Sequence, residues 1–326
     1  MSIEPDTKCI ERTDAEYLPD TTEYNIKDIQ HIVISGGGTL GFTFYGILRE
    51  ANQYGLWNIE HISTLYGTSI GSVLSTILCL RYDWNVLDDY FIKRPWAKVF
   101  HYDIQKLFDC VQNIGIFDKE VTEQMLSPLL LGKDILPTVT MLEYFHKTKI
   151  ELHIIVTNIN NFELVDISYK THPTWKLVDA VHASCAIPII YKPINIDGIF
   201  YCEGGFCSNY PIDLCIKNGA KPENIMGIKP LRVNNEACNI EMSSLFDYVT
   251  ILMNNILKKV IVDTCINIKY TFEVPTNARS LIDISNVAEN RVVREELIQT
   301  GRNYFYAQYQ TMQSNDGTPI SNEVFT

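Results

Sequence analysis

The chain has 326 residues, of which 46% are hydrophobic and 20% are charged, as in an ordinary globular protein. Its net charge of -12 excludes a general nucleic-acid binder and argues against bulk electrostatic attraction to an anionic membrane. Nine scattered cysteines without paired spacing indicate free thiols in a reducing compartment. The polar N-terminus is unlike a signal peptide, and no apolar run approaches the roughly 20 residues of a membrane span. We therefore expect an intracellular, cytoplasmic protein, with peripheral contact to a membrane or lipid surface left open.

The first part of the chain alternates strand-like and helix-like segments. Residues 1–28 are polar and aperiodic and predict an N-terminal arm, so that a single domain would span 29–326. A strand at 31–35 runs into three glycines and a helical pattern, and a strand at 62–66 runs into a second glycine turn and a helix at 70–80. This repetition predicts an α/β fold with a mostly parallel sheet and crossover helices.

The rest of the chain predicts a helical insertion and further strands. Residues 82–148 read as helices and loops that cap the sheet. The later predicted elements are strands at 152–157, 163–167 and 224–229, turn-linked strands within 187–210, an amphipathic helix at 245–257 and a strand at 266–274. Asn286 and Glu289 have the spacing of a capping box, which predicts that a long final helix begins there.

The sharpest motif is a G-x-S-x-G pentapeptide at Gly67–Gly71, which lies between a strand pattern and an apolar helix. A nucleophile elbow needs this arrangement, because small flanking residues admit the strained turn and the helix N-terminus faces the developing anion. Ser69 is therefore the candidate nucleophile. The alternative is an ordinary Gly-Ser turn that caps a helix.

Three successive glycines within Gly36–Gly41 also follow a strand pattern. Their backbone N–H groups can turn inward without side chains in the way, which suits an oxyanion or a phosphate. The segment also satisfies the G-x-G-x-x-G fingerprint of dinucleotide-binding proteins, which needs an acidic residue at the end of the next strand. Glu60 has about that spacing but precedes the strand at 62–66. This position disfavours the nucleotide alternative.

A hydrolytic serine needs a base. All seven histidines precede Glu203, so none follows it in the order serine, acid, histidine of the α/β-hydrolases. His153 and His182 could act only in an unusual order, and each is more simply a packed residue. Glu203 is followed by Gly204 and Gly205 at a strand-to-turn junction, where glycines permit close approach. We therefore expect a carboxylate that touches the serine directly.

Taken together, the ordered motifs closely resemble those of the patatin-like phospholipases over roughly residues 30–230. The segments that carry the resemblance are Gly36–Gly41, Gly67–Gly71, Ala183–Pro188, Ile196–Gly198, Tyr201–Gly205 and Asn209–Pro211. The resemblance implies a three-layer α/β/α domain with a mostly parallel central sheet, a serine–carboxylate dyad and a glycine-loop oxyanion hole. It also implies hydrolysis of lipid acyl esters without a metal or other cofactor. Residues 231–326 would form a C-terminal extension of this motif core.

Two positions depart from the family pattern. The family's dyad acid is an aspartate followed by glycine, and Glu203 stands there with one more methylene. A misplacement near 1 Å can cost about a hundredfold in rate. Leu40 replaces a frequent Arg or Lys beside the glycine loop, but backbone donors do not depend on that side chain. Asp197 is an alternative acid, although its Asp-Gly pair predicts a hairpin turn.

The sequence therefore predicts a lipolytic serine acyl-ester hydrolase of the phospholipase A type that acts on a lipid or phospholipid. The alternative is a catalytically weak lipid-binding or regulatory protein of the same fold. The predicted site comprises the catalytic pair Ser69 and Glu203, the oxyanion-hole glycines Gly36, Gly37, Gly38 and Gly41, and the glycines of the elbow and the acid turn, Gly67, Gly71, Gly204 and Gly205. No metal or cofactor is expected, because the sequence has no ligand cluster at metal spacing.

Overall fold

The computed structural model describes residues 29–231, 248, 249, 252, 266, 268–275 and 281–315. The predicted arm at 1–28 and most of the predicted amphipathic helix at 245–257 lie outside the described residues. The division of the chain into an arm and one domain stays a prediction. In the described part of the chain, no helix combines the length and the apolar composition needed to cross a membrane.

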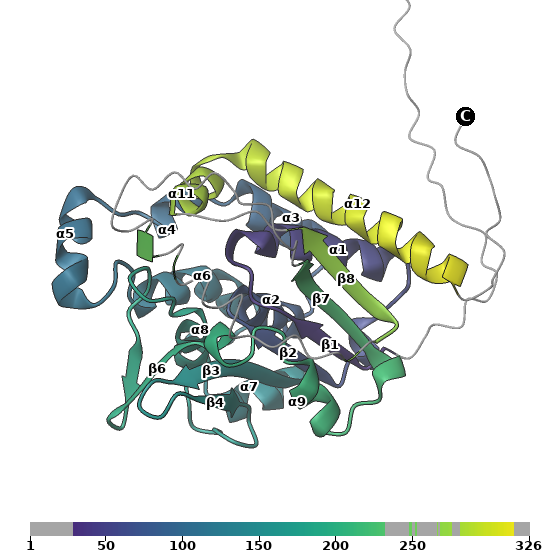
Figure 1. Ribbon diagram of the computed structural model, residues 1–326, viewed down its shortest axis with the longest axis horizontal. Coiled ribbons are helices and arrows are strands. Elements are labelled where there is room, and N and C mark those ends of the chain that lie inside the picture. The colour runs from purple at the N-terminus through teal and green to yellow at the C-terminus, as the bar shows by residue number, and fades with distance from the viewer. Residues whose placement is uncertain are drawn as a thin grey trace, which may run out of the picture.

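Eight strands form one sheet in the described residues, in the order β5-β6-β3-β2-β1-β7-β8, with β4 also paired to β3 (Figure 1). The strands are β1 (His31–Ile34), β2 (Thr64–Thr68), β3 (Glu151–Asn158), β4 (Glu163–Ile167), β5 (Ile194–Ile196), β6 (Ile199–Glu203), β7 (Ile225–Leu231) and β8 (Tyr270–Pro275). Strands β3, β2, β1, β7 and β8 run parallel, whereas β4 and β6 pair antiparallel with β3. The predicted α/β fold with a mostly parallel central sheet is confirmed.

Helices connect the strands and cover the sheet. They are α1 (Gly41–Gln53), α2 (Ile70–Cys79), α3 (Trp84–Asp88), α4 (Trp96–Val99), α5 (Ile104–Asn113), α6 (Lys119–Leu131), α7 (Met141–Thr148), α8 (Leu177–Cys185), α9 (Ile212–Lys217), α11 (Leu281–Glu289) and α12 (Arg291–Asn315). The short helical turns are η1 (Gly38–Leu40), η2 (Ile59–His61), η4 (Gly204–Phe206) and η5 (Pro222–Asn224), and η3 (Asp89–Lys93) is a π-helical turn. The predicted helical insertion at 82–148 thus consists of α3 to α7.

The two faces of the sheet are covered unequally. Side chains alternate along β1, so Ile32 and Ile34 face the large core with α1 and α2, whereas Val33 faces the other side. There Val33 and Tyr66 pack against Ile212 of α9 in a smaller cluster. On the larger side α12 lies along α1 (Figure 1), and the buried Glu50 of α1 binds side chains of α12. Helices α1 and α12 are therefore joined along the larger side of the sheet.

The C-terminal helices differ from the sequence prediction. Asn286 and Glu289 lie inside α11, so the prediction that the final helix begins there is wrong. The long helix α12 begins at Arg291, and the Asn290 side chain accepts a hydrogen bond from Val292 N at 3.0 Å. Asn290 therefore satisfies one of the backbone donors that a helix start leaves free. Two helices stand where the sequence indicated one.

Candidate active site

Ser69 occupies a strained turn between β2 and α2. Its backbone torsions are φ 54° and ψ -126°, a region that residues other than glycine rarely adopt. Surrounding contacts hold this conformation: Ser69 N donates a hydrogen bond to Ser184 Oγ at 2.8 Å, and Ser184 Oγ donates to Ile155 O at 2.7 Å. A Cβ on Gly67 would collide with the backbone of Gly71, so the turn admits only glycine there. A strained strand-to-helix turn of this kind is what a nucleophile elbow requires.

Strand pairing brings the carboxyl ends of β2 and β6 together. Thr68 of β2 lies opposite Ile155 of β3, and Glu203 of β6 lies opposite Val156. Strand β4 occupies the other edge of β3 at 154–158, so β6 must pair with the same edge as β2. The two strands consequently meet end to end, with Ser69 and Glu203 as the residues at the junction.

Glu203 is 3% exposed, and in the described part of the chain only one oxygen of its carboxyl group has a hydrogen-bond partner of normal geometry. Its Oε1 accepts a hydrogen bond from Gly205 N at 3.1 Å. Its Oε2 is buried and has no hydrogen-bond partner among the described residues. Burial raises the pKa of Glu203 from 4.5 to about 8, while the Ser69 hydroxyl and the Gly205 N–H hold it lower than burial alone would. A group with this pKa can exchange a proton near neutral pH.

The glycine loop lies beside the serine. A Cβ built on Gly36 would lie 3.2 Å from the Ser69 Cβ, which places loop and elbow in contact. Gly36 N donates to Asn209 O at 3.0 Å, so that donor is already occupied. The N–H groups of Gly37 and Gly38 have no acceptor among the described residues. Gly38 has φ +54° and open space around its α-carbon, so its N–H and that of Gly37 are the donors available to a ligand.

Other glycines and acids from the sequence analysis take different positions. Gly41 N donates to Gly38 O and Thr39 O, and a side chain on Gly41 would collide with Ile70. A side chain on Gly204 would collide with the backbone of β3 at Ile155. Asp197 is exposed in the turn between β5 and β6, with φ 53°. Asp197 thus lies at the far end of β6 from the junction.

The two histidines considered as bases are bonded elsewhere. His153 Nδ1 lies 2.9 Å from an oxygen of Asp166, and its ring stacks on Tyr66 at a centroid distance of 4.0 Å. His182 Nδ1 lies 3.0 Å from Thr122 Oγ1, and its Nε2 lies 2.9 Å from Lys192 O. Both rings are buried. Among the residues that the structure describes, no group of three or more His, Cys, Asp and Glu side chains is placed to hold a metal ion.

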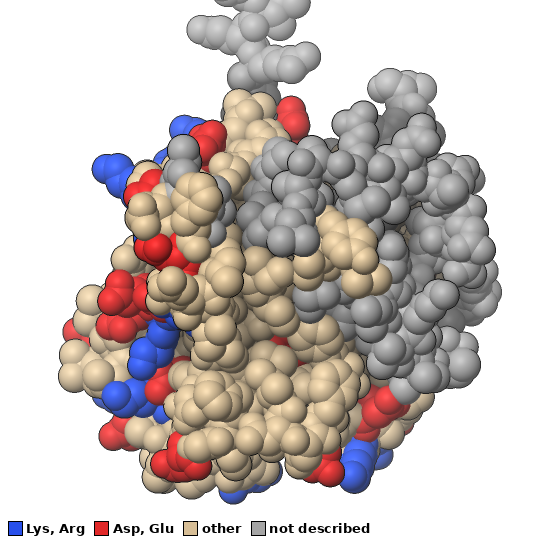
Figure 2. Space-filling view, turned by 60° about the vertical axis from the view of Figure 1, so that its left-hand side comes forward, with Lys and Arg blue, Asp and Glu red and all other residues tan. Residues whose placement is uncertain are grey.

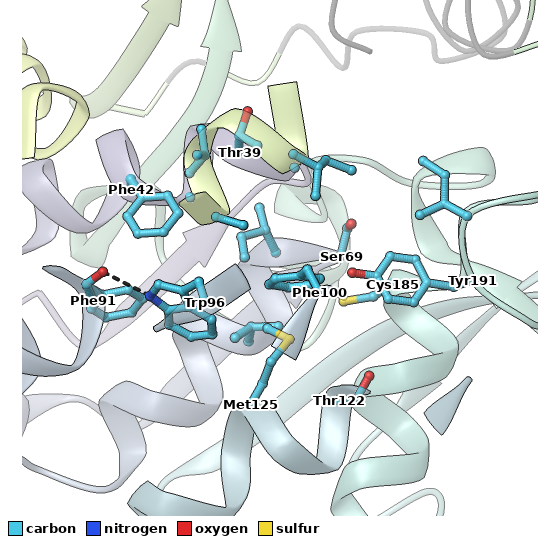
Figure 3. Close-up of a pocket in the computed structure, with 18 of the residues that line it drawn as sticks. Thr39, Phe42, Ser69, Phe91, Trp96, Phe100, Thr122, Met125, Cys185 and Tyr191 are labelled. Carbon is cyan, nitrogen blue, oxygen red and sulfur yellow. Dashed lines mark hydrogen bonds between the residues drawn. The ribbon is translucent and has the colours of Figure 1, made fainter. Parts of the chain in front are cut away.

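Ser69 lies at one end of an apolar cavity (Figure 3). The empty space, including the mouth, is about 990 Å³. The lining residues are uncharged and come mainly from α2, η3, α4, α6, the segment after α8, and α11: Val73, Ile77, Tyr90, Phe91, Trp96, Phe100, Thr122, Met125, Cys185, Ile187, Ile190, Tyr191, Ile284, Val287 and Ala288. Cys185 and Tyr191 lie next to Ser69, whereas Phe91 and Trp96 lie at the opposite end. An apolar chain fits this space better than any charged group.

Sequence reasoning missed the cavity and two positioning residues. Ser184 and Asn209 stand in segments that carry the family resemblance, but their sequence context indicates no role for either. The structure shows that Ser184 holds the Ser69 backbone and that Asn209 Nδ2 donates to Ser35 Oγ at 2.9 Å, beside the glycine loop. The cavity residues gave no signal, because each has the spacing of an ordinary core residue in its own helix.

One buried arginine joins two walls of the cavity. Arg294 of α12 is 3% exposed and donates to Val287 O at 2.7 Å and Ala288 O at 3.0 Å, at the end of α11. It also donates to Ile92 O of η3 at 2.8 Å. Helix α11 carries part of the cavity lining, and η3 carries Tyr90 and Phe91. The guanidinium therefore fixes α11 against η3.

We expect Arg294→Met to lower the free energy of unfolding by about 2–4 kcal/mol, because it leaves several buried carbonyl oxygens without a donor. Arg291→Met is the matched control: Arg291 is 57% exposed and pairs with Glu295 on the same helix, so its loss should cost less than about 0.5 kcal/mol. Urea unfolding of both variants measures the difference. Equal stability of the two variants would contradict the role given to Arg294.

Comparisons with known proteins agree with the fold and the motifs. The family model for patatin-like phospholipase matches residues 32–216. The protein named "Probable lipid hydrolase 463L" of Invertebrate iridescent virus 6 is 28% identical over 231 residues, which are 69% of this chain and 77% of the relative. "Uncharacterized protein R571" of Acanthamoeba polyphaga mimivirus is 26% identical over 186 residues, which are 57% of this chain and 61% of that relative.

A solved structure shares the fold over a longer range than the family model covers. The crystal structure of VipD from Legionella pneumophila has a TM-score of 0.55 and 16% sequence identity, over 88% of this chain and 67% of VipD. The family match covers more than half of the chain, and it includes the elbow, the glycine loop and the Glu203 turn. The chain belongs to the patatin-like phospholipase family, whose members include lipid hydrolases.

Proposed function

We propose that this protein is a serine acyl-ester hydrolase of the phospholipase A type, with Ser69 as nucleophile and Glu203 as base. The observation that carries the proposal is the end-to-end meeting of β2 and β6 at one end of an uncharged cavity, which unites a strained serine with a buried carboxylate. The substrate is a lipid or phospholipid. Its acyl chain occupies the cavity, and its polar head group stays at the mouth.

In the first step, the Glu203 carboxylate accepts the proton of Ser69 Oγ as that oxygen attacks the acyl carbonyl carbon. The carbonyl oxygen becomes an oxyanion, which accepts hydrogen bonds from the N–H groups of Gly37 and Gly38. The N-terminus of α2 directs its positive end toward the same charge. Collapse of the intermediate breaks the ester bond, and Glu203 returns the proton to the leaving alcohol.

In the second step, water attacks the acyl group now bound to Ser69. Glu203 accepts a proton from that water, and the same glycine donors hold the second oxyanion. The intermediate then releases the fatty acid while Ser69 Oγ regains its proton from Glu203. Each step needs only side chains and backbone groups of this chain, and no group other than water enters as a co-reactant.

Activity should rise with pH, because only the ionised form of Glu203 can act as base. With a pKa of about 8, kcat/KM should be low below neutrality and level off above about pH 9. In the folded protein the pKa of Glu203 lies above its ordinary value of 4.5. The contribution of Glu203 to the free energy of unfolding is therefore fully present below pH 4.5 and is lost as the pH rises through 8. A pH–rate profile on an uncharged soluble ester measures the first effect. A profile that is already flat from pH 5 would contradict Glu203 as the base.

The assay that tests the function is turnover of a p-nitrophenyl ester and of a phospholipid by the purified protein. Release of a fatty acid from the phospholipid supports the proposal. A second candidate is a lipid-binding or regulatory protein with little turnover. The extra methylene of Glu203 relative to the family's aspartate favours it, because a carboxylate displaced by about 1 Å can cost about a hundredfold in rate. Binding of a phospholipid without hydrolysis at any pH from 5 to 10 would select this second candidate.

A further inference from the structure

Helix α5 carries large apolar side chains that face solvent. Phe108, Val111 and Ile114 are 74%, 82% and 57% exposed. Their spacing of three residues places them on one side of the helix and its C-terminal cap. In Figure 1, α5 stands at the left edge of the molecule, away from the sheet. An exposed apolar stripe of this kind is typical of a surface that meets a partner.

The chain on both sides of α5 belongs to the cavity wall. Before the helix, Phe100 lines the cavity and its ring lies 5.9 Å from that of Phe117. After the helix, Phe117 N donates to Ile190 O at 2.8 Å, and Ile190 also lines the cavity. The segments on both sides of α5 therefore contribute to the cavity wall and attach the helix to the part of the molecule that holds the cavity.

A second exposed apolar cluster lies beside the Glu203 turn. Ile159 and Phe162 in the loop between β3 and β4 are 44% and 58% exposed, and Phe200 of β6 is 39% exposed. Ile159 N donates to Phe200 O at 2.8 Å, which joins the loop to the strand. The ring of Phe162 lies 6.2 Å from that of Phe206, three residues after Glu203. The second cluster therefore lies near the Glu203 turn, which carries the other side chain of the candidate pair beside Ser69.

The side of the molecule on which α5 stands is poor in charge. Figure 2 turns this side of the molecule forward and shows a broad surface of uncharged residues, with Lys, Arg, Asp and Glu gathered toward its margins. An interface with a protein partner usually has a rim of charged and polar residues that fixes the orientation of the partner. Binding to a lipid surface needs only apolar contact. A face with few charged residues also lowers the free-energy cost of removing charged groups from water when it binds.

We propose that α5 and the Ile159–Phe162–Phe200 cluster dock the protein onto a lipid surface with electrically neutral head groups, with the mouth of the cavity toward the lipid. The chain's net charge of -12 disfavours an anionic surface. Docking in this orientation lets an acyl chain pass from the lipid into the uncharged cavity without crossing water. The reason for the orientation rests on the proposed function, but the docking step itself needs no hydrolysis.

The test measures binding of the full chain carrying Ser69→Ala to phosphatidylcholine vesicles by co-sedimentation, so that hydrolysis cannot alter the lipid. We expect Val111→Asp and Phe162→Asp, each added to Ser69→Ala, to weaken the partition coefficient at least tenfold. The matched control is Val86→Asp on α3, where Val86 is also exposed, at 44%. The control should bind vesicles as the Ser69→Ala protein does. Circular dichroism and thermal melts establish that each variant is folded.

Three results would overturn the docking proposal. They are absence of vesicle binding, equal binding by all three Asp variants, and a dimer in solution that Val111→Asp converts to a monomer while vesicle binding persists. The last result would assign the α5 face to a second copy of this chain. Vesicle binding by Ser69→Ala without ester turnover by the unmodified protein would leave the docking intact and refute the proposed function. Turnover of a soluble ester without vesicle binding would refute the docking proposal and leave the proposed function intact.

Discussion

Ser69→Ala is expected to lower kcat on an ester substrate by at least about 10⁴-fold, because the variant has no atom that can form the acyl-enzyme. The fold should survive. The hydrogen bond that holds the elbow comes from the Ser69 backbone N, which alanine retains, and alanine tolerates the φ of 54° about as well as serine does. Initial rates on a p-nitrophenyl ester give kcat, and a thermal melt of the same sample gives the melting temperature that reports on the fold.

The control for this prediction is another serine outside the site. Ser127 of α6 is half-buried, does not line the cavity, and its hydroxyl donates to Glu123 O of the same helix. Ser127→Ala should therefore match the unmodified protein in both rate and melting temperature. Full activity in a folded Ser69→Ala protein would refute the serine-hydrolase proposal, whatever the Glu203 variants show.

Glu203→Gln is expected to lower kcat/KM by about 10²–10⁴-fold, the usual contribution of a general base. The amide keeps the shape of the side chain and can still accept a hydrogen bond from Gly205 N, but it cannot take a proton from Ser69. Glu203→Asp should retain activity, because a shorter carboxylate at this position is the pattern of the family. All three proteins are compared on one soluble ester, with circular dichroism to establish that each is folded.

The competing acid is Asp197. Its exposed place in the β5–β6 turn predicts that Asp197→Asn changes kcat/KM by less than about twofold. If Glu203→Gln were silent and Asp197→Asn abolished turnover, the base would be misassigned. If the natural protein showed no turnover and Glu203→Asp restored it, the result would support position 203 as the place of the base. It would also identify the natural chain as a pseudoenzyme.

The elbow could be predicted because its determinants are local. The glycines at 67 and 71 stand two residues from Ser69 in the sequence, and the strand and helix patterns that flank them are strong. The boundaries were less accurate: β2 begins at Thr64 and not at Ile62. Strand ends depend on which neighbours offer hydrogen bonds, and that is decided by the tertiary fold.

The relation of Glu203 to Ser69 could be expected from the absence of a later histidine, the glycines that follow Glu203 and the motif resemblance, but not from any local structure pattern. Their meeting depends on the register of β6 against β3, a contact between segments far apart in the chain. The cavity could not be predicted from the sequence for the same reason. Trp96, Met125 and Val287 come from three separate helices, and nothing in their own surroundings distinguishes a cavity wall from a core. The start of α12 was misplaced because Asn286 and Asn290 are both plausible caps, and packing selects the second.

The most direct test of the central claim is covalent labelling of the unmodified protein with a fluorophosphonate, followed by peptide mass spectrometry. The reagent reacts only with a serine that is activated and has access to an oxyanion site. We predict a single adduct on the peptide that contains Ser69, and loss of labelling in Glu203→Gln. An adduct on any other serine, or no adduct at the pH of maximal ester turnover, would contradict the assignment of Ser69 as the nucleophile.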